Sequence, residues 1–281
     1  MYWEGDTNMN WFKKSASETQ ITHGQRLWLY ITASTIMFLL VVPTLIVIPM
    51  SFSASQYLEF PPKDWSFRWY ESYFSSNAWM SATATSLKAG LFTMLVATPI
   101  GVIASYGLHV SSHRAARLVY MLLITPIMIP VILIGIGSFY IYVQIGLVNT
   151  MFGLVVAHTI LALPLVLIVV TSAFKSFDMG QEQAARSLGA SRFTAFMTVT
   201  LPQIRFSVIT AALLAFLTSF DEVIVAMFIS GGDNATLTKN MFNALRDQID
   251  PTIASISTIM IIVSTTLVIV TQIFGKGKGV K

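Results

Sequence analysis

Long apolar runs separated by short polar segments organise this chain. Six of the runs reach about 20 residues, the length that an α-helix needs to cross the hydrocarbon core of a bilayer. None shows the strict alternation of apolar and polar residues that is typical of membrane-spanning strands. The pattern therefore predicts six transmembrane helices, near residues 28–51, 80–106, 117–142, 151–174, 203–229 and 253–274.

Two prolines, Pro126 and Pro130, fall inside the third apolar run. Each lacks a backbone N–H donor, and a proline ring clashes with the preceding turn of a helix. The two prolines therefore predict a kink in the third helix. The kink either serves the packing of the helix against its neighbours or breaks the helix where it lines a transport path.

The composition supports a membrane location. The chain is 54% hydrophobic and 11% charged, and its mean hydropathy is +0.69. A soluble domain of this size carries about 25% charged residues. Cysteine is absent, which excludes disulfides and thiolate metal sites. We expect an all-α integral membrane protein, with an N-terminal segment 1–26, a six-helix domain 27–274 that includes a polar loop 175–202, and a tail 275–281.

The basic residues are distributed unevenly between the two sides of the predicted membrane. If the N-terminus is cytoplasmic, 12 of the 17 Lys and Arg residues lie on that side, four lie on the other side, and Lys88 lies inside a span. Cytoplasmic loops are enriched in basic residues. Both termini and the 175–202 loop are therefore predicted to be cytoplasmic. The cytoplasmic set is Lys13, Lys14, Arg26, Arg114, Arg117, Lys175, Arg186, Arg192, Arg205, Lys276, Lys278 and Lys281, and the outer set is Lys63, Arg68, Lys239 and Arg246.

The polar loop 175–202 carries signals for two short helices. Asp178, with Gln181 three residues later, is typical of a capping box, and Gly189 is suited to end the first helix in a left-handed conformation. A second helix is expected from Ser191, with Phe193 and Phe196 facing inward. Taken alone, these signals are equally typical of an ordinary pair of interfacial helices.

The spacing within this loop resembles the cytoplasmic coupling loop of permease subunits in binding-protein-dependent ABC importers. That family pattern is Glu-Ala-Ala, three residues, Gly, nine residues, Ile, one residue and Leu-Pro. The matching residues here are Gln183, Ala184, Ala185, Gly189, Val199, Leu201 and Pro202, with Gln183 in place of Glu and Val199 in place of Ile. The resemblance implies the six-helix fold of type I ABC importer permeases, also called MetI-like.

The resemblance also implies partners and a location. The loop would dock on an ABC ATPase dimer through Glu182, Gln183, Ala184, Ala185, Gly189, Leu201 and Pro202. A second permease, homologous or identical, and a periplasmic solute-binding protein would complete the complex in the bacterial inner membrane, in contact with lipid. The chain has no phosphate-binding loop, so ATP and magnesium would be used by the ATPase, and this subunit would be neither an enzyme nor a cofactor-binding protein. No basic block suggests nucleic acid.

Four ionisable residues fall inside predicted spans: Lys88, His158, Asp221 and Glu222. A charge at mid-membrane costs about 2.5–3.5 kcal/mol, so each needs a partner, water or a function. Counting residues from the helix ends places all four in one layer. Lys88 could pair with one acid while His158 accepts a hydrogen bond nearby. Alternatively, at least one acid faces a water-filled path and binds a cation, because one lysine cannot neutralise two carboxylates. No spacing suggests a bound metal.

The segment Ser219-Phe220-Asp221-Glu222-Val223, followed by Thr236-Leu237, resembles the polyamine branch of this permease family, which commonly carries Ser-Phe-Asp-Asp here. That resemblance implies a small cationic solute such as putrescine or spermidine, with Asp221 and Glu222 as substrate-binding residues. Importers of opines, amino acid derivatives, phosphonates, thiamine or iron share much of the pattern. An ion-coupled secondary transporter, with Asp221 and His158 as a proton relay, is a further alternative.

Overall fold

The computed structural model describes residues 22–247 and 250–275, so most of the predicted N-terminal segment and the 276–281 part of the tail lie outside the described residues. Helices are the only extended regular structure in the described part. In chain order they are α1 (Leu27–Met50), α2 (Arg68–Ser75), α3 (Asn77–Val110), α4 (Ala115–Ile124), η2 (Thr125–Met128), α5 (Val131–Ile145), α6 (Met151–Ser176), α7 (Met179–Ser187), α8 (Arg192–Ala195), η3 (Phe196–Thr200), α9 (Leu201–Phe220), α10 (Ile224–Ile229), η4 (Gly232–Asn234), α11 (Leu237–Asp247) and α12 (Thr252–Gly275).

The six predicted apolar runs match the helices of the structure. Within the described residues, five continuous helical stretches are long and apolar enough to cross a membrane, and a bent pair of helices makes a sixth crossing if the pair counts as one span. That pair, Ala115–Met128 and Val131–Ile145, bends by 101°. Pro126 lies in the first turn of η2 and Pro130 precedes α5, with Ile129 in the extended conformation that a following proline favours. The predicted kink is therefore confirmed, and it is sharp.

The fifth predicted span differs from the prediction of one helix over 203–229. Its helix starts earlier, at Arg192, and stops at Phe220. Asp221 and Glu222 follow, and the chain resumes as the short helix α10. A carboxylate is unfavourable inside an apolar helix but favourable at a helix N-terminus, where it accepts hydrogen bonds from free N–H groups. The two acids therefore break the span that their apolar neighbours predict to be continuous.

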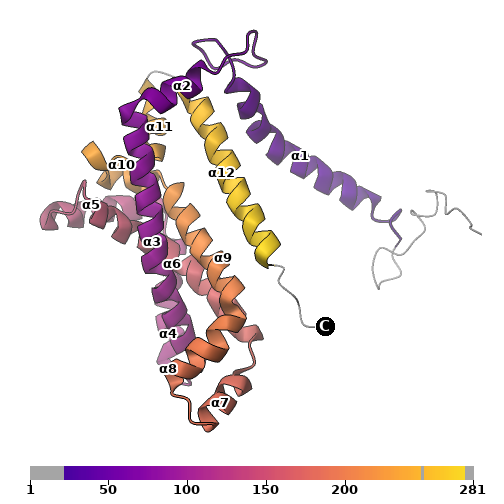
Figure 1. Cartoon of the computed structure of the whole chain (residues 1–281), viewed down its shortest axis with the longest axis vertical. Helices are drawn as coiled ribbons and strands as arrows, with labels where there is room; N and C mark the ends of the chain where they lie inside the picture. Colours follow the sequence, from indigo (N-terminus) through magenta and orange to yellow (C-terminus); the bar gives the residue numbers. More distant parts are fainter. Residues whose placement is uncertain (1–21, 248–249, 276–281) are drawn as a thin grey trace, which may run out of the picture.

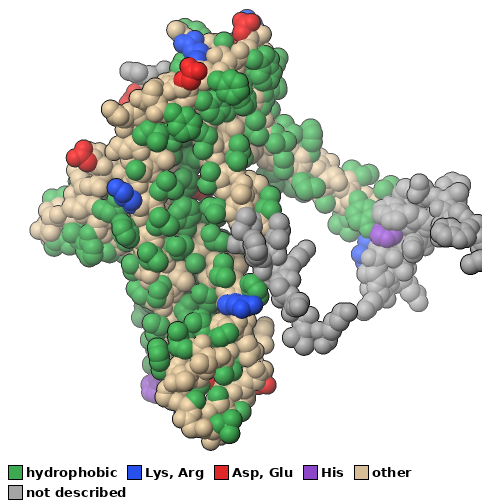
Figure 2. Space-filling view, in the orientation of Figure 1, with side chains coloured by type: hydrophobic (Ala, Val, Ile, Leu, Met, Phe, Trp, Pro, Cys, Tyr) green, Lys and Arg blue, Asp and Glu red, His purple; other side chains and the backbone are tan. Residues whose placement is uncertain are grey.

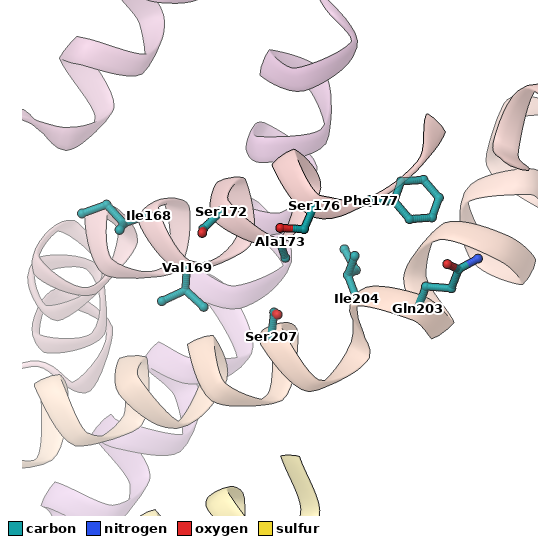
Figure 3. Close-up of a pocket in the computed structure, with 9 residues that line it drawn as sticks. All are labelled: Ile168, Val169, Ser172, Ala173, Ser176, Phe177, Gln203, Ile204 and Ser207. Carbon is teal, nitrogen blue, oxygen red and sulfur yellow. The ribbon is translucent and has the colours of Figure 1, made fainter. Parts of the chain in front are cut away.

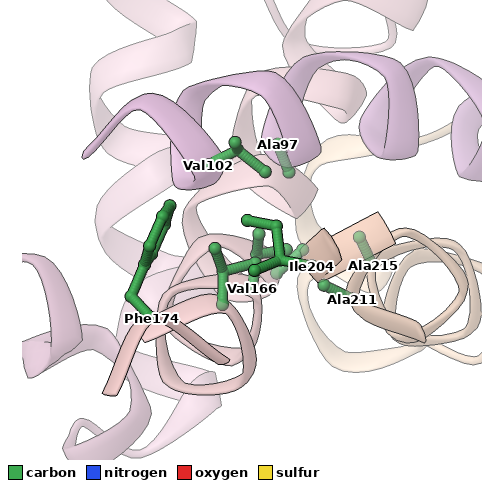
Figure 4. Packing of buried hydrophobic residues seen from close by; sticks show 9 residues of the cluster. Ala97, Val102, Val166, Phe174, Ile204, Ala211 and Ala215 are labelled. Carbon is green, nitrogen blue, oxygen red and sulfur yellow. The ribbon is translucent and has the colours of Figure 1, made fainter. Parts of the chain in front are cut away.

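Three long helices, α3, α6 and α9, form the centre of the bundle. Their contacts are made by alanine and by branched or aromatic side chains that are fully buried (Figure 4). Small residues let membrane helices approach closely, because packing rather than water exclusion drives their association. At Gly101 of α3, a Cβ atom would lie 2.4 Å from Cγ1 of Val166 in α6, so this crossing requires glycine. The labelled cluster is Ala97, Val102, Val166, Phe174, Ile204, Ala211 and Ala215.

Two groups of short helices lie at the ends of this bundle. The α7–α8 pair lies at one end, and α2 and α11 lie at the other (Figure 1). Along the length between them, hydrophobic side chains cover much of the visible face (Figure 2). An apolar surface of this kind is what a hydrocarbon environment favours. The polar loop 175–202 and the acids of the fifth span are therefore separated by about the length of α9, which is about 30 Å at 1.5 Å per residue.

Candidate functional site

The first helix of the polar loop, α7, is held at both ends by the residues that the sequence indicated. Asp178 caps its N-terminus by accepting a hydrogen bond from the Gly180 N–H at 2.9 Å. Gly189 ends it with φ of +97°, and the N–H groups of Gly189 and Ala190 donate to the carbonyls of Arg186 and Ala185. This is a Schellman motif. The predicted start and stop are confirmed.

Gln181 does not complete the capping box that its spacing predicts. Its side-chain oxygen instead accepts a hydrogen bond of 2.6 Å from the amide of Gln203 in α9. The tertiary partner satisfies the same acceptor that the local motif would have used. This contact connects α7 to the first turn of α9.

The second helix, α8, begins at Ser191, whose hydroxyl accepts from the Thr194 N–H at 3.1 Å. Phe196 packs against Tyr106 of α3, with ring centroids 4.8 Å apart. Phe193, however, is 74% exposed, so its predicted inward orientation is wrong. Ala195 is the buried residue of this turn, and a residue two positions away on a helix points about 200° from it.

The predicted ATPase-contacting residues divide into an outward and an inward group. Gln183, Ala184 and Gly189 are exposed, Ala185 is half-buried, and Pro202 is exposed in the first turn of α9, beside the half-buried Leu201. Glu182 is only 1% exposed, because its side chain points toward Tyr106 and Thr200. It therefore does not belong to the outer face of the loop.

Leu188 and Phe193 are exposed residues of the loop that the sequence analysis did not assign to docking. Leu188 is 90% exposed and Phe193 is 74% exposed, both at the end of the molecule formed by α7 and α8. Large apolar side chains in water cost free energy unless a partner covers them. An apolar residue directly before the helix-ending glycine was the signal in the sequence.

The second polar site lies where α9 ends. Glu222 is tucked into the break: its carboxyl oxygens accept from the N–H groups of Val225 at 2.9 Å and Ala226 at 3.0 Å. Its backbone carbonyl accepts from the Thr238 hydroxyl at 2.8 Å. The Glu222 side chain thus caps the first turn of α10 from the position before the N-cap residue Val223, and it is engaged by the protein itself.

His158 of α6 lies directly behind this cap. It is 0% exposed, and its Nδ1 lies 2.7 Å from the Ser219 hydroxyl. Its Nε2 lies 3.7 Å from Oε2 of Glu222, which is beyond ordinary hydrogen-bonding distance. The predicted hydrogen-bonded histidine is therefore found, next to one of the two acids.

Lys88 does not form the ion pair considered from the sequence. It belongs to the same layer, because its neighbour Ala89 packs in one cluster with Ala157 and Val225. Its own side chain is exposed, and among the described residues it forms no ion pair with either acid. Adjacent positions on a helix point about 100° apart, and Ala89 takes the inward one.

Asp221 is the accessible acid of the pair. It caps the C-terminus of α9, is exposed, and within the described part of the chain its carboxyl forms no hydrogen bond or ion pair. The two neighbouring acids are therefore in different environments, one used by the fold and one available to a ligand. Residues 22–247 and 250–275 hold no group of three or more His, Asp or Glu residues that could bind a metal.

Two of the polar clefts formed by the described residues lie away from these acids and from the α7–α8 pair. One, of about 620 Å³, opens between α6 and α9 and is lined by Ser172, Ser176, Gln203 and Ser207 (Figure 3). It presents hydroxyl and amide groups without an acid, so it has no basis for cation selection. The other, of about 640 Å³, lies at the α11 end and includes Asp233 and Lys239.

The Lys239 ammonium lies at the C-terminal end of α10, the short helix that follows the break in the fifth span. It donates to the backbone carbonyls of Met227, at 3.2 Å, and Ser230, at the C-terminal end of α10. Burial lowers the pKa of Lys239 from its ordinary value. Glu222 at one end of α10 and Lys239 at the other therefore each satisfy backbone groups that the short helix leaves free.

Replacing Glu222 by alanine is expected to destabilise the protein by about 1–2 kcal/mol, because two backbone N–H groups of α10 lose their acceptor. The midpoint of thermal unfolding of the purified protein in detergent measures this. Asp221→Ala, one residue away and without such bonds, is the matched control and should leave the midpoint unchanged. Equal midpoints for the two variants would contradict the capping role.

An apolar bundle with a broken span and a polar, capped helix pair at one end is typical of a multi-pass membrane protein. Comparison with known proteins agrees: the chain belongs to the family described as the binding-protein-dependent transport system inner membrane component, whose model matches residues 97–277. It is thus a permease subunit of an ABC importer in the inner membrane, and the expected type I fold is confirmed.

Individual relatives refine this likeness. The chain is 28% identical over 234 residues to the spermidine/putrescine transport system permease protein PotC of Haemophilus influenzae, covering 83% of this chain and 91% of PotC. It is 28% identical over 229 residues to the putrescine transport system permease protein PotI of Escherichia coli K12, covering 79% and 81%. A crystal structure of a bacterial ABC transporter involved in the import of the acidic polysaccharide alginate shares the fold, with a TM-score of 0.68, 16% identity, and coverage of 92% and 99%.

Proposed function

We propose that this permease takes up a small cationic solute, a polyamine such as putrescine or spermidine, that a periplasmic binding protein delivers. ATP hydrolysis by a separate ABC ATPase dimer drives the uptake, and the chain itself binds no cofactor. The observation that carries the proposal is Asp221, an exposed carboxylate without a described partner at the break of an apolar span. Such a group requires water or a cation.

The chemistry of the site fits a primary ammonium. A carboxylate accepts hydrogen bonds only, and an ammonium donates three, so the two form a charge-assisted pair. The neighbouring Glu222 is already engaged with the N–H groups of α10. We therefore assign cation binding to Asp221. Glu222 has the role of stabilising the break in the span by capping α10. The names of the PotC and PotI relatives support the same class of solute.

The partners follow from the family and from the surfaces of the chain. The α7–α8 end, with Gln183, Ala184 and the exposed Leu188, docks on the ATPase in the cytoplasm, and both termini lie on that side. The opposite end, formed by α2 and α11, receives the binding protein. A second, homologous permease completes the path beside Asp221 and shields its carboxylate from lipid.

The test is uptake of labelled putrescine and spermidine by cells that carry the complete transport system. We expect saturable uptake that requires a hydrolysis-competent ATPase and persists for some time after a protonophore. Uptake of a competing opine, phosphonate or thiamine, without polyamine uptake, would overturn the solute assignment. Uptake that is unchanged when the ATPase cannot hydrolyse ATP, but stops when the protonophore is added, would favour the ion-coupled alternative.

A further inference from the structure

Glu182 is the feature of the loop that docking does not explain. It lies next to the motif residue Gln183, yet the two side chains diverge by about 100° around α7. Gln183 is exposed, whereas Glu182 is 1% exposed. An acid buried this completely needs hydrogen-bond donors, because desolvation otherwise disfavours the carboxylate.

The donors come from two different parts of the membrane bundle. The Tyr106 hydroxyl of α3 donates to Oε1 of Glu182 at 2.5 Å, and the Thr200 hydroxyl donates to Oε2 at 2.5 Å. Both distances are at the short end of the range for O–H···O hydrogen bonds. The Tyr106 ring is fixed in turn by Phe174 and Phe196, with centroids 5.8 and 4.8 Å away. One carboxyl group therefore joins α7 to α3 and to the π-helical turn of the fifth span.

The fifth span links this junction to the solute site. Residues Arg192–Phe220 form one helical stretch, which contains Thr200 within the π-helical turn Phe196–Thr200 and ends at Asp221. A π turn carries a looser hydrogen-bond pattern than the α-helix around it and often marks a functional point. Thr200 therefore connects α7 to a helix whose other end bears the exposed acid.

We infer that Glu182 is a positioning residue for energy coupling: its carboxyl group fastens the ATPase-docking helix to α3 and to the fifth span, so that movement of the loop moves the bundle. It acts through Tyr106 and Thr200 and does not touch the solute. This inference rests on the ATP-driven import proposed above but not on the identity of the solute. It reassigns Glu182 from the docking surface to the connection behind it.

The experiment reconstitutes the whole complex, permeases, ATPase and binding protein, in liposomes with wild-type, Glu182→Ala and Glu182→Gln chains. It measures ATP hydrolysis with and without binding protein, and solute taken up per ATP. For Glu182→Ala we expect about a tenfold loss of solute per ATP, the size of a lost hydrogen bond to a charged acceptor, and a loss of stimulation by the binding protein. Glu182→Gln keeps the shape and part of the bonding and should recover most of both.

Single partners isolate the connection. Tyr106→Phe and Thr200→Val each remove one hydroxyl and should each lower the coupling ratio by about threefold, a smaller effect because one bond remains. In the Glu182→Ala background neither should have a further effect, which is the signature of a shared interaction. Thr198→Val is the matched control, because the exposed Thr198 hydroxyl donates only to the Thr194 carbonyl within its own helix.

The outcomes separate the two proposals. A Glu182→Ala complex that assembles and keeps both wild-type stimulation and wild-type solute per ATP overturns the inference, as does additive behaviour of the three substitutions. Equal loss of basal and stimulated hydrolysis, without a change in their ratio, points to a purely structural role and also overturns it. Failure of the wild type to carry polyamines refutes the solute assignment alone, since stimulation of hydrolysis tests Glu182 without any known solute.

Discussion

Asp221→Asn is expected to reduce the initial rate of polyamine uptake at low solute concentration by about 30-fold, because a neutral amide cannot form the charge-assisted bond to an ammonium. The substitution keeps the size of the side chain. It also leaves the backbone N–H of residue 221 free to donate to the Leu217 carbonyl, the bond that ends α9. The loss should therefore appear in uptake and not in abundance or thermal stability.

Two further substitutions decide between a charge requirement and a surface effect. Asp221→Glu retains the charge on a longer arm and should retain far more uptake than Asp221→Asn. Asp64→Asn removes another exposed acid, in the loop before α2 at the end proposed to receive the binding protein, and should lower uptake far less than Asp221→Asn. Measurements use cells with matched amounts of the three variants. Uptake by Asp221→Asn within about twofold of wild type would show that this carboxylate does not bind the solute.

The dependence of the uptake rate on solute concentration shows at which step of transport Asp221 acts. A carboxylate that binds solute equally in the ground and transition states raises the half-saturation concentration when it is lost, whereas one needed only during the conformational change lowers the maximal rate. The binding protein delivers the solute, so a site inside the permease is met after docking. We therefore expect the maximal rate to fall more than the half-saturation concentration rises.

Apolar run length was sufficient to predict most of the fold. The runs are long enough to cross a membrane as helices. Within hydrocarbon, the backbone N–H and C=O groups can form hydrogen bonds only inside the protein, which favours a helix. The kink at Pro126 and Pro130 also follows from local chemistry. The break at Asp221 did not, because the apolar residues of α10 continue the hydrophobic run and conceal the point where Glu222 caps a new helix.

The polar loop, too, could be predicted only in part. The spacing from Gln183 to Pro202 identified the loop, and local capping signals predicted the bounds of α7. Which face of α7 turns inward could not be predicted, because a nine-residue helix with polar residues all round has no clear apolar stripe. The inward position of Glu182 depends on hydroxyls 76 and 18 residues away in the chain. Tertiary partners of this kind leave no local pattern.

The exposed apolar pair of the loop predicts the second large effect. Leu188→Asp combined with Phe193→Asp is expected to weaken association with the ATPase by about 100-fold, because buried apolar anchors dominate the energy of an interface and a carboxylate cannot enter an apolar cleft. Both side chains are already almost fully in water, at 90% and 74% exposure, so the folded permease loses no packing when they are replaced.

Co-purification of the ATPase with tagged permease measures this association, and Leu245→Asp is the control. Leu245 is 50% exposed on α11, at the opposite end of the bundle, so its replacement makes the same chemical change away from the loop. The control should retain the ATPase in full. If the double variant also retains it, the loop docks through its polar residues, Gln183 and Arg186, and the exposed leucine and phenylalanine serve another contact. If both variants lose it, the substitutions act through folding, which the thermal midpoint of each purified permease reveals.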